Sequence, residues 1–325
     1  MEDIRELISR PVVRELALFE NAFCHLLDSD NSKMQQVKEH ILQTNGKKLR
    51  PILLLLSALL SGKVSDVTIK SAVFIELFHT ASLLHDDVVD DAKLRRGKPS
   101  VNAVFDNKVA VLSGDYLFTA SAQAAASMGN LQIIAVLGKL GMHLSLGELD
   151  QLTNVDELDF SEASYLKVIR EKTAMLFAAC TEIGALSADA SEAEVAALRS
   201  YGEHIGMAFQ IRDDIFDYFD DANIGKPTGN DIREGKVTLP LIYAIEHAGE
   251  KERKSLTDLL RTGDFSDENV HKLITFAKEN QGINYAYQTM QVYADKAKAA
   301  LHIFPDVDAK AALLAFVDYV IVRDK

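Results

Sequence analysis

The chain has 325 residues, of which 48% are hydrophobic, and its formal net charge is −13. This charge argues against a general nucleic-acid binder, because such proteins present basic stripes to phosphate groups. Only six prolines and 17 glycines interrupt the sequence, and no Pro/Gly/Ser-rich linker separates its parts. We therefore expect an all-α protein with one domain, residues 1–325, built of long helices.

The two cysteines, Cys24 and Cys180, have no metal-type spacing and indicate a reducing compartment. The N-terminal segment Met1–Arg10 is charged and has no apolar signal core. No apolar run reaches membrane-spanning length. The sequence therefore predicts a cytoplasmic protein without a transmembrane segment.

In chain order, the first predicted elements are two amphipathic helices up to about residue 44, broken near Asp28–Asn31. Pro51 then opens an apolar helix, a favourable place for proline. A further helix is expected from about Val67 to Asp91. Its stretch Ala72–Leu84 is apolar on almost every side, so we expect it to be buried.

Further helices are predicted at about 109–129, 131–152, 161–186 and 192–221. A polar, glycine-rich loop is expected from Asn223 to Lys236, and Pro240 lies at the start of another helix. We find neither convincing strand alternation nor a glycine-rich nucleotide loop.

An acidic cluster directly follows the apolar stretch: Asp86, Asp87, Asp90 and Asp91. On a helix, Asp86 and Asp90 lie on one face, with Asp87 on its flank. A solvated helix end is the commoner explanation for a run of acids. Here, however, the acids continue an apolar helix, which places them at the rim of the core.

The same pattern recurs as Asp213, Asp214 and Asp217, again after an apolar helical run. Two Asp-Asp-x-x-Asp clusters on separate helices predict two walls of one metal-binding cavity. Magnesium prefers carboxylate oxygens and is commonly completed by waters and substrate phosphates. Calcium is disfavoured because the sequence has no twelve-residue calcium loop.

Basic residues gather beside these clusters, and arginine and lysine side chains suit phosphate groups. Taken singly, each is more simply explained as a solvated surface group. As sets they predict two diphosphate sites. The residues are Lys47 and Arg50 in one turn, Lys93, Arg95, Arg96 and Lys98 after the first cluster, Arg170, Lys172 and Thr173 in a predicted helix, and Lys226 after the second cluster.

These motifs resemble those of the trans-polyprenyl diphosphate synthases, particularly the octaprenyl and heptaprenyl type, from about Asn45 to Pro240. The matching segments are GKKLRP, HTASLLHDDVVDDAKLRRGKPS, KTAMLF, FQIRDDIFDY and GKPTGND. One departure is that Asn45 replaces the first glycine of the family's Gly-Gly-Lys-x-x-Arg-Pro motif, although asparagine also tolerates unusual backbone angles.

The resemblance implies a single helical bundle around a deep central cavity, the isoprenoid synthase type of fold, usually as a homodimer. It implies magnesium-dependent, head-to-tail condensation of isopentenyl diphosphate with an allylic prenyl diphosphate. No nucleic-acid partner is expected, and a peripheral membrane contact for product release is left open.

Carried over by motif position, the resemblance also implies roles for individual residues. The isopentenyl diphosphate group comprises Lys47, Arg50, His79 and Arg96. The allylic diphosphate group comprises Arg95, Lys172, Thr173, Gln210 and Lys226. The metal group comprises Asp86, Asp90 and Asp213, with Asp87, Asp214 and Asp217 in support. Alone, His79 would more often be a core histidine and Gln210 a packing amide.

Three residues upstream of Asp86 bear on product length. Ala81 and Ser82 lie about one helical turn before Asp86, are small, and should let a growing chain pass. Phe78 lies about 12 Å before Asp86, at 1.5 Å per residue. It either closes the tunnel or turns aside into helix packing. We expect a medium-to-long product.

Three alternatives stay open: a short-chain farnesyl or geranylgeranyl diphosphate synthase, a class I terpene cyclase, and a subunit of a heteromeric synthase. A cyclase needs no isopentenyl site, and non-catalytic subunits tend to lack the aspartate clusters. Product length, preferred primer, homodimer or heteromer, and downstream pathway are not fixed by the sequence.

Overall fold

The computed structural model describes residues 4–43, 46–157, 159–219 and 228–323. Within these ranges the chain is helical apart from turns, connecting segments and one two-stranded hairpin, which confirms the predicted all-α class. The contacts gather into two compact units, each built from separate chain segments, and the single domain expected from the sequence stays a prediction. The first unit comprises Met1–Lys139, Ala179–Arg199 and Ile303–Ala315, and the second comprises Leu140–Ala178, Ser200–His302 and Phe316–Lys325.

The first unit contains the N-terminal helices and both strands. Its helices are α1 (Ile4–Ser9), α2 (Val13–Leu26), α3 (Ser32–Gln43), α4 (Leu49–Ser61), α5 (Asp66–Val89), α6 (Val101–Val104) and α7 (Asn107–Ser127), with the 3-10 turn η1 (Arg10–Val12) and strands β1 (Leu94–Arg95) and β2 (Lys98–Pro99). The break predicted near Asp28–Asn31 is confirmed, because it separates α2 from α3.

The second unit contains most of the C-terminal helices. They are α9 (Glu162–Ile169), the π-helical turn η2 (Arg170–Ala174), α12 (Asn230–Arg233), α13 (Leu239–Glu246), α14 (Glu250–Thr262), α15 (Asp267–Glu279) and α16 (Gly282–Ala300). The elements that run from one unit into the other are α8 (Leu131–Glu157), α10 (Met175–Ser187), α11 (Glu192–Phe216), η3 (Leu301–Ile303) and α17 (Asp308–Val322). Pro240 is the second residue of α13, as predicted.

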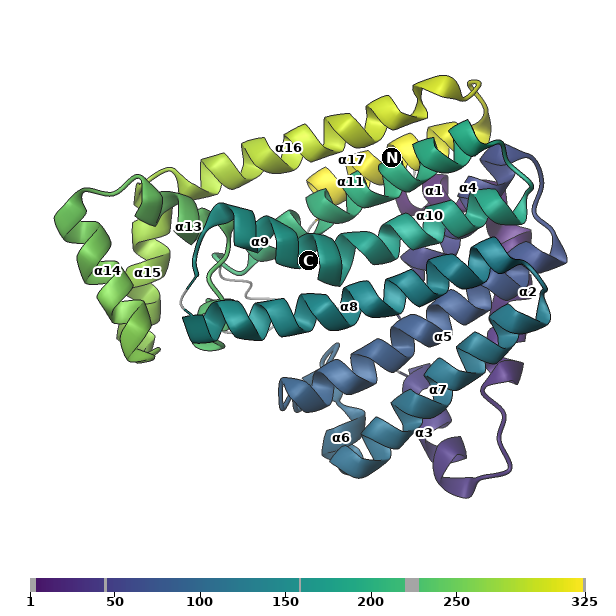
Figure 1. Ribbon diagram of the computed structural model, residues 1–325, viewed down its shortest axis with the longest axis horizontal. Helices are drawn as coiled ribbons and strands as arrows, with labels where there is room; N and C mark the ends of the chain where they lie inside the picture. Colours follow the sequence, from purple (N-terminus) through teal and green to yellow (C-terminus); the bar gives the residue numbers. More distant parts are fainter. Residues whose placement is uncertain (1–3, 44–45, 158, 220–227, 324–325) are drawn as a thin grey trace. The chain divides into compact units, whose positions relative to one another are not determined.

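Helix α5 is the core helix of the first unit. It begins with a capping box, in which Ser65 and Thr68 each accept a hydrogen bond from the other's backbone N–H. Its apolar stretch is buried, as expected from its pattern, and Figure 1 shows α7 running alongside it. Asp91, with φ of 47°, adopts the left-handed conformation just beyond the helix.

By length and composition, α5 is the one helix among the described residues that could cross a membrane. Its apolar window is 61% buried inside the protein, as is usual for a core helix. Of the two cysteines, Cys180 is buried and Cys24 is exposed, so only the former is a core residue.

Candidate active site

The first aspartate cluster lies at the C-terminal end of α5. The backbone N–H of Asp90 donates to the carbonyl of Asp86 at 2.8 Å, so the helical register continues through the cluster. The side chains of Asp86 and Asp90 therefore share one face, as predicted. Asp86 is half-buried and Asp90 is exposed. This arrangement suits a ligand that approaches from the end of the helix.

Asp87 is committed to a protein partner. It is buried, and its carboxylate forms an ion pair with Arg95, whose Nε donates to it at 2.9 Å. Asn102 donates to the backbone carbonyl of Asp87 at 3.0 Å. Asp87 therefore holds the Arg95 guanidinium at the start of the hairpin.

The hairpin places Arg96 in a restrained position. Arg96 and Gly97 form the two-residue turn between β1 and β2, and both have positive φ, 53° and 75°. Such turns favour glycine or asparagine, so an arginine there is strained. Its guanidinium lies against Gly46, since a Cβ on Gly46 would come within 2.5 Å of the Arg96 Cζ. The basic turn and the hairpin therefore meet within the first unit.

A cavity in the first unit collects part of the predicted isopentenyl diphosphate group. His79, Arg95 and Arg96 line it together with Glu76. Burial lowers the pKa of His79 well below its ordinary value, and the charges of Arg50, Arg96 and Arg95 lower it further. His79 is therefore a neutral hydrogen-bonding group at neutral pH.

Glu76 was missed by the sequence analysis. Burial raises the pKa of its carboxyl, while Arg50, Arg96 and Lys48 act to lower it. It lies one helical turn before His79, so a carboxylate facing the same cations could have been found from the spacing on α5. Lys47 is exposed and Arg50 is half-buried at the start of α4.

In the second unit, the three aspartates at the end of α11 have three different surroundings. Asp213 forms an ion pair with Arg323 and keeps 42% of its side chain exposed. Asp214 is buried and accepts hydrogen bonds from Tyr165 at 2.6 Å and Gln210 at 2.7 Å. Burial is the main reason that the pKa of Asp214 is raised well above its ordinary value.

Asp217 accepts hydrogen bonds from the backbone at the start of α12. Its carboxylate accepts hydrogen bonds from the backbone N–H groups of Asn230 and Asp231, both at 3.0 Å, and its carbonyl accepts one from Gly229 at 2.8 Å. Asp217 therefore ties the end of α11 to the start of α12. Lys226, predicted to bind the allylic diphosphate, lies outside the described residues.

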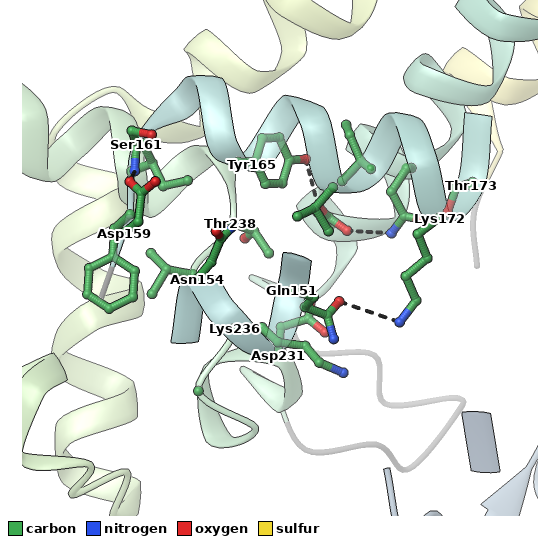
Figure 2. Close-up of a pocket in the computed structure, with 18 residues that line it drawn as sticks. Gln151, Asn154, Asp159, Ser161, Tyr165, Lys172, Thr173, Asp231, Lys236 and Thr238 are labelled. Carbon is green, nitrogen blue, oxygen red and sulfur yellow. Dashed lines mark hydrogen bonds between the residues drawn. The ribbon is translucent and has the colours of Figure 1, made fainter. Parts of the chain in front are cut away.

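A cavity of about 200 Å³ in the second unit contains most of the predicted allylic group. Lys172, Thr173, Gln210 and Asp214 line it, and Thr173 donates to Gln210 at 2.8 Å. Figure 2 shows Lys172 reaching toward Gln151, with a hydrogen bond of 3.4 Å between them. The structure therefore gathers Lys172, Thr173 and Gln210 beside the second aspartate cluster.

Charged residues from neighbouring segments complete this cavity. Lys172 pairs with Glu148 at 2.6 Å, so its ammonium group is held by α8. Asp231 and Lys236, which the sequence analysis did not single out, also line the cavity (Figure 2). Burial raises the pKa of Asp231 to about 7, and the charge of Asp217 adds to this rise. Arg95, the remaining described member of the allylic group, lines the cavity of the first unit instead.

The segment that carries Lys172 and Thr173 is not a regular α-helix. Residues Arg170–Ala174 form a π-helical turn, where the sequence predicts an uninterrupted helix over 161–186. Two glycines allow close packing around this turn. A Cβ on Gly147 would lie 2.9 Å from the backbone nitrogen of Lys172, and one on Gly206 would lie 2.5 Å from the Cα of Ala174. Such turns often occur at functional sites, where they redirect side chains.

The residues present fit a hard divalent cation. Asp86 and Asp90 in the first unit, and separately Asp213 in the second, offer carboxylate oxygens, which magnesium prefers. Within the described ranges, no three or more His, Cys, Asp or Glu side chains are already gathered as a metal site. Magnesium commonly completes such sparse carboxylate groups with water and with substrate phosphates.

The residues predicted to bear on product length lie on α5 in the first unit. Phe78 is buried, and its ring packs edge-on against Phe118 of α7, with 4.8 Å between centroids. Ala81 is fully buried, and the Ser82 hydroxyl donates to the carbonyl of His79 at 2.9 Å. Of the two orientations considered for Phe78, the structure shows contact with a neighbouring helix.

Comparisons with known proteins find similar sequences and similar structures. The family model described as polyprenyl synthetase matches residues 31–277. The octaprenyl diphosphate synthase of Haemophilus influenzae is 37% identical over 290 residues, which are 89% of this chain and 88% of that protein. Two solved structures are also similar. One is a polyprenyl synthase of Caulobacter crescentus complexed with calcium and isoprenyl diphosphate, with 34% identity, a TM-score of 0.92 and 98% of each chain covered. The other is the geranylgeranyl pyrophosphate synthase of Bacteroides thetaiotaomicron, with 44% identity, a TM-score of 0.86 and coverage of 99% of this chain and 100% of that one.

Proposed function

Because this chain belongs to the polyprenyl synthetase family and is a prenyltransferase, we propose that it uses magnesium to extend an allylic diphosphate with isopentenyl diphosphate into a medium-to-long product. The observation that best supports this proposal is the cavity in which Lys172, Thr173 and Gln210 lie beside the second aspartate cluster. A diphosphate needs such a combination of cation, hydrogen-bond donors and metal-binding carboxylates.

We assign isopentenyl diphosphate to the group Lys47, Arg50, His79 and Arg96. The guanidinium of Arg96, held against Gly46, supports this assignment because it brings the hairpin to the basic turn. The lowered pKa of His79 keeps it neutral, so it can bind an anion as a hydrogen-bond donor without titrating near pH 7. Fixed cations of this kind cost little reorganisation when the diphosphate arrives.

We assign the allylic diphosphate to Arg95, Lys172, Thr173, Gln210 and Lys226. Asp86, Asp90 and Asp213 would hold magnesium, which, when bound, draws charge from the diphosphate and makes it a leaving group. The remaining aspartates of the two clusters would support the binding residues around them: Asp87, Asp214 and Asp217. Asp87 orients Arg95, Asp214 orients Gln210, and Asp217 fixes the backbone after α11.

The reaction proceeds by loss of the allylic diphosphate, with the C–O bond electrons leaving on oxygen. The double bond of isopentenyl diphosphate attacks the allylic cation, a C–C bond forms, and a proton is then lost, with the departing diphosphate as the proposed base. The cation survives only where water is excluded. The buried apolar stretch Ala72–Leu84 of α5 supports such a site in the first unit.

A short-chain synthase is the second candidate. It is favoured by the position of Phe78, a large side chain only two helical turns from the first aspartate cluster, and by the similarity to a geranylgeranyl pyrophosphate synthase. A medium-to-long product is favoured by the small residues Ala81 and Ser82, which lie nearer the cluster, and by the similarity to an octaprenyl diphosphate synthase.

The test is an incubation of the pure protein with magnesium, labelled isopentenyl diphosphate and, in separate reactions, geranyl, farnesyl or geranylgeranyl diphosphate. Chromatography should show a metal-dependent ladder of labelled products that ends above geranylgeranyl diphosphate. Asp86→Ala should lower turnover by at least ~100-fold, as expected when a main electrostatic contributor is lost. Asp91→Ala is the matched control, because Asp91 is exposed at the same helix end and pairs with Lys93.

The other outcomes separate the alternatives. Label in a product no longer than geranylgeranyl diphosphate identifies a short-chain synthase. Consumption of the allylic substrate into an unlabelled hydrocarbon identifies a terpene cyclase. Activity that appears only after addition of a second protein identifies a heteromeric subunit. Near-normal turnover of Asp86→Ala, with the fold intact by circular dichroism, contradicts the assigned metal site.

We also infer a cytoplasmic enzyme with peripheral membrane contact during release of its product. The support is chemical, because a medium-to-long prenyl tail partitions into lipid by about 0.8 kcal/mol per CH₂ group. Release into lipid vesicles, measured by flotation of labelled product, tests this contact.

A further inference from the structure

Arg323, near the C-terminal end of the chain, makes contacts in the second unit that the family motifs do not explain. It follows the last turn of α17, and its side chain is only 8% exposed although it carries a full charge. Buried arginines are retained where their charge and planar group are both used. The contacts of Arg323 show what it is used for.

The guanidinium of Arg323 covers one turn of α11. It lies over the ring of Phe209, with 3.8 Å from Cζ to the ring centroid, and Nη2 donates to the carbonyl of Phe209 at 3.3 Å. The same Nη2 forms the ion pair with Asp213, four residues further along the helix. Stacking and hydrogen bonding together fix the plane of the guanidinium.

The backbone of Arg323 is held as firmly as its side chain. Its N–H donates to the carbonyl of Tyr319 at 2.8 Å, which continues the register of α17. Its carbonyl accepts a hydrogen bond of 3.0 Å from Arg212, the residue before Asp213. Arg212 is itself buried and donates to the Tyr287 hydroxyl at 2.9 Å. The end of α17 is thus docked onto α11 next to the second aspartate cluster.

Resting on the proposed metal role of Asp213, we propose that Arg323 is a positioning residue that acts as a substitute cation. It holds the Asp213 carboxylate until a diphosphate arrives, so that this carboxylate takes a metal ion only together with the diphosphate. A cation paired with a carboxylate repels a second cation that approaches the same oxygens. The incoming diphosphate offsets this repulsion, because its negative charge attracts both the Arg323 guanidinium and the metal ion.

The experiment measures metal binding rather than turnover. Pure protein without substrate is titrated with Mn²⁺, and unbound Mn²⁺ is followed by electron paramagnetic resonance. Removing the cation with Arg323→Gln should tighten Mn²⁺ binding by about three-fold or more, because the Coulomb repulsion is gone. With saturating inorganic diphosphate, the two proteins should differ by less than about two-fold.

Three further variants test whether the effect depends on the charge of Arg323. Arg323→Met also removes the charge but keeps an apolar contact for Phe209, so it replaces the glutamine variant if that one fails to fold. Arg323→Lys keeps the charge and should restore the wild-type affinity for Mn²⁺ alone. Lys298→Gln is the matched control. It breaks the 2.7 Å pair of Lys298 with Asp318, another ion pair of α17, and should leave Mn²⁺ affinity unchanged.

Each remaining outcome has a distinct meaning. Unchanged or weaker Mn²⁺ binding by folded Arg323→Gln or Arg323→Met overturns the substitute-cation role. The variant Asp213→Ala separates this inference from the assigned function. If it binds Mn²⁺ and diphosphate as tightly as wild type, then Asp213 is not a metal ligand, and the assignment of the metal site fails together with this inference.

Discussion

At the scale of residues, the two aspartate clusters show that identical side chains in identical spacing are given different tasks by their neighbours. Asp87 holds Arg95, Asp214 accepts from Tyr165 and Gln210, and Asp217 fixes a stretch of backbone. Asp86, Asp90 and Asp213, which motif position assigns to the metal, each keep a part of their surface exposed. That assignment stays a prediction.

A buried carboxyl near the second cluster makes the stability of the protein pH-dependent. The pKa of Asp231 is raised to about 7, chiefly by burial and then by Asp217. The unfolded chain releases this proton near pH 4, whereas the folded protein keeps it up to about pH 7. Between these values the folded state binds more protons, so the contribution of Asp231 to stability falls as pH rises.

We therefore expect Asp231→Asn to gain stability over the wild type as pH rises from 4 to 8, by on the order of 4 kcal/mol. The measurement is urea unfolding of metal-free protein at several pH values. Asp267→Asn, an exposed partner of Arg233, is the control and should show no such pH trend. A constant difference between Asp231→Asn and wild type across this range would show that Asp231 titrates normally.

At the scale of elements, the helix carrying Lys172 illustrates how packing alters a local structure that the sequence leaves regular. The π-helical turn Arg170–Ala174 adds an extra residue to the helix that carries Lys172. Gly147 and Gly206, on neighbouring helices, pack closely against this turn. Neither glycine has a positive φ, so both serve close approach rather than backbone freedom. The turn changes which face Lys172 and Thr173 present, which regular helical periodicity could not predict.

The geometry of α5 carries a prediction about product length. Ala81→Phe places a ring about one turn before Asp86 and should shorten the product to farnesyl or geranylgeranyl diphosphate. Phe78→Ala should lengthen the product distribution, although Phe118, which packs against Phe78, can limit this gain. Product chromatography with labelled isopentenyl diphosphate measures both effects.

The control for added bulk is Lys70→Phe, an exposed position on the same helix. It should leave product length unchanged. If Ala81→Phe also leaves product length unchanged, this face of α5 does not line the path of the growing chain.

At the scale of the whole molecule, an exposed apolar row on α8 is consistent with the homodimer that the family resemblance implies. Met142, Leu146 and Leu149 follow helical spacing along one face, and each is more than half exposed. Contiguous exposed patches of large apolar side chains commonly mark protein–protein interfaces. A second copy of the chain is the partner that the family resemblance implies.

We expect the double variant Leu146→Glu, Leu149→Glu to be monomeric, because two charges would be buried in the interface. Light scattering after gel filtration should give about twice the 35.9 kDa chain mass for wild type and about one chain mass for the variant. Ile303→Glu, also at an exposed apolar residue, should remain a dimer. A monomeric wild type, or a dimeric double variant, contradicts this interface.

By itself, the sequence determined the features that rest on local periodicity and residue chemistry. Spacing of 3.6 residues per turn explains the burial of Ala72–Leu84 and the shared face of Asp86 and Asp90. The limited conformations of proline explain the helix boundaries near Pro51 and Pro240. Motif order, likewise local, was enough to indicate the family.

Only the tertiary structure decided which partners the charged side chains take. The pairing of Arg323 with Asp213 spans 110 positions along the chain, and that of Tyr165 with Asp214 spans 49. The raised pKa of Asp231 and the contact of Arg96 with Gly46 depend in the same way on packing between elements. Periodicity cannot show such contacts, because it describes the face of one helix and not the element packed against that face.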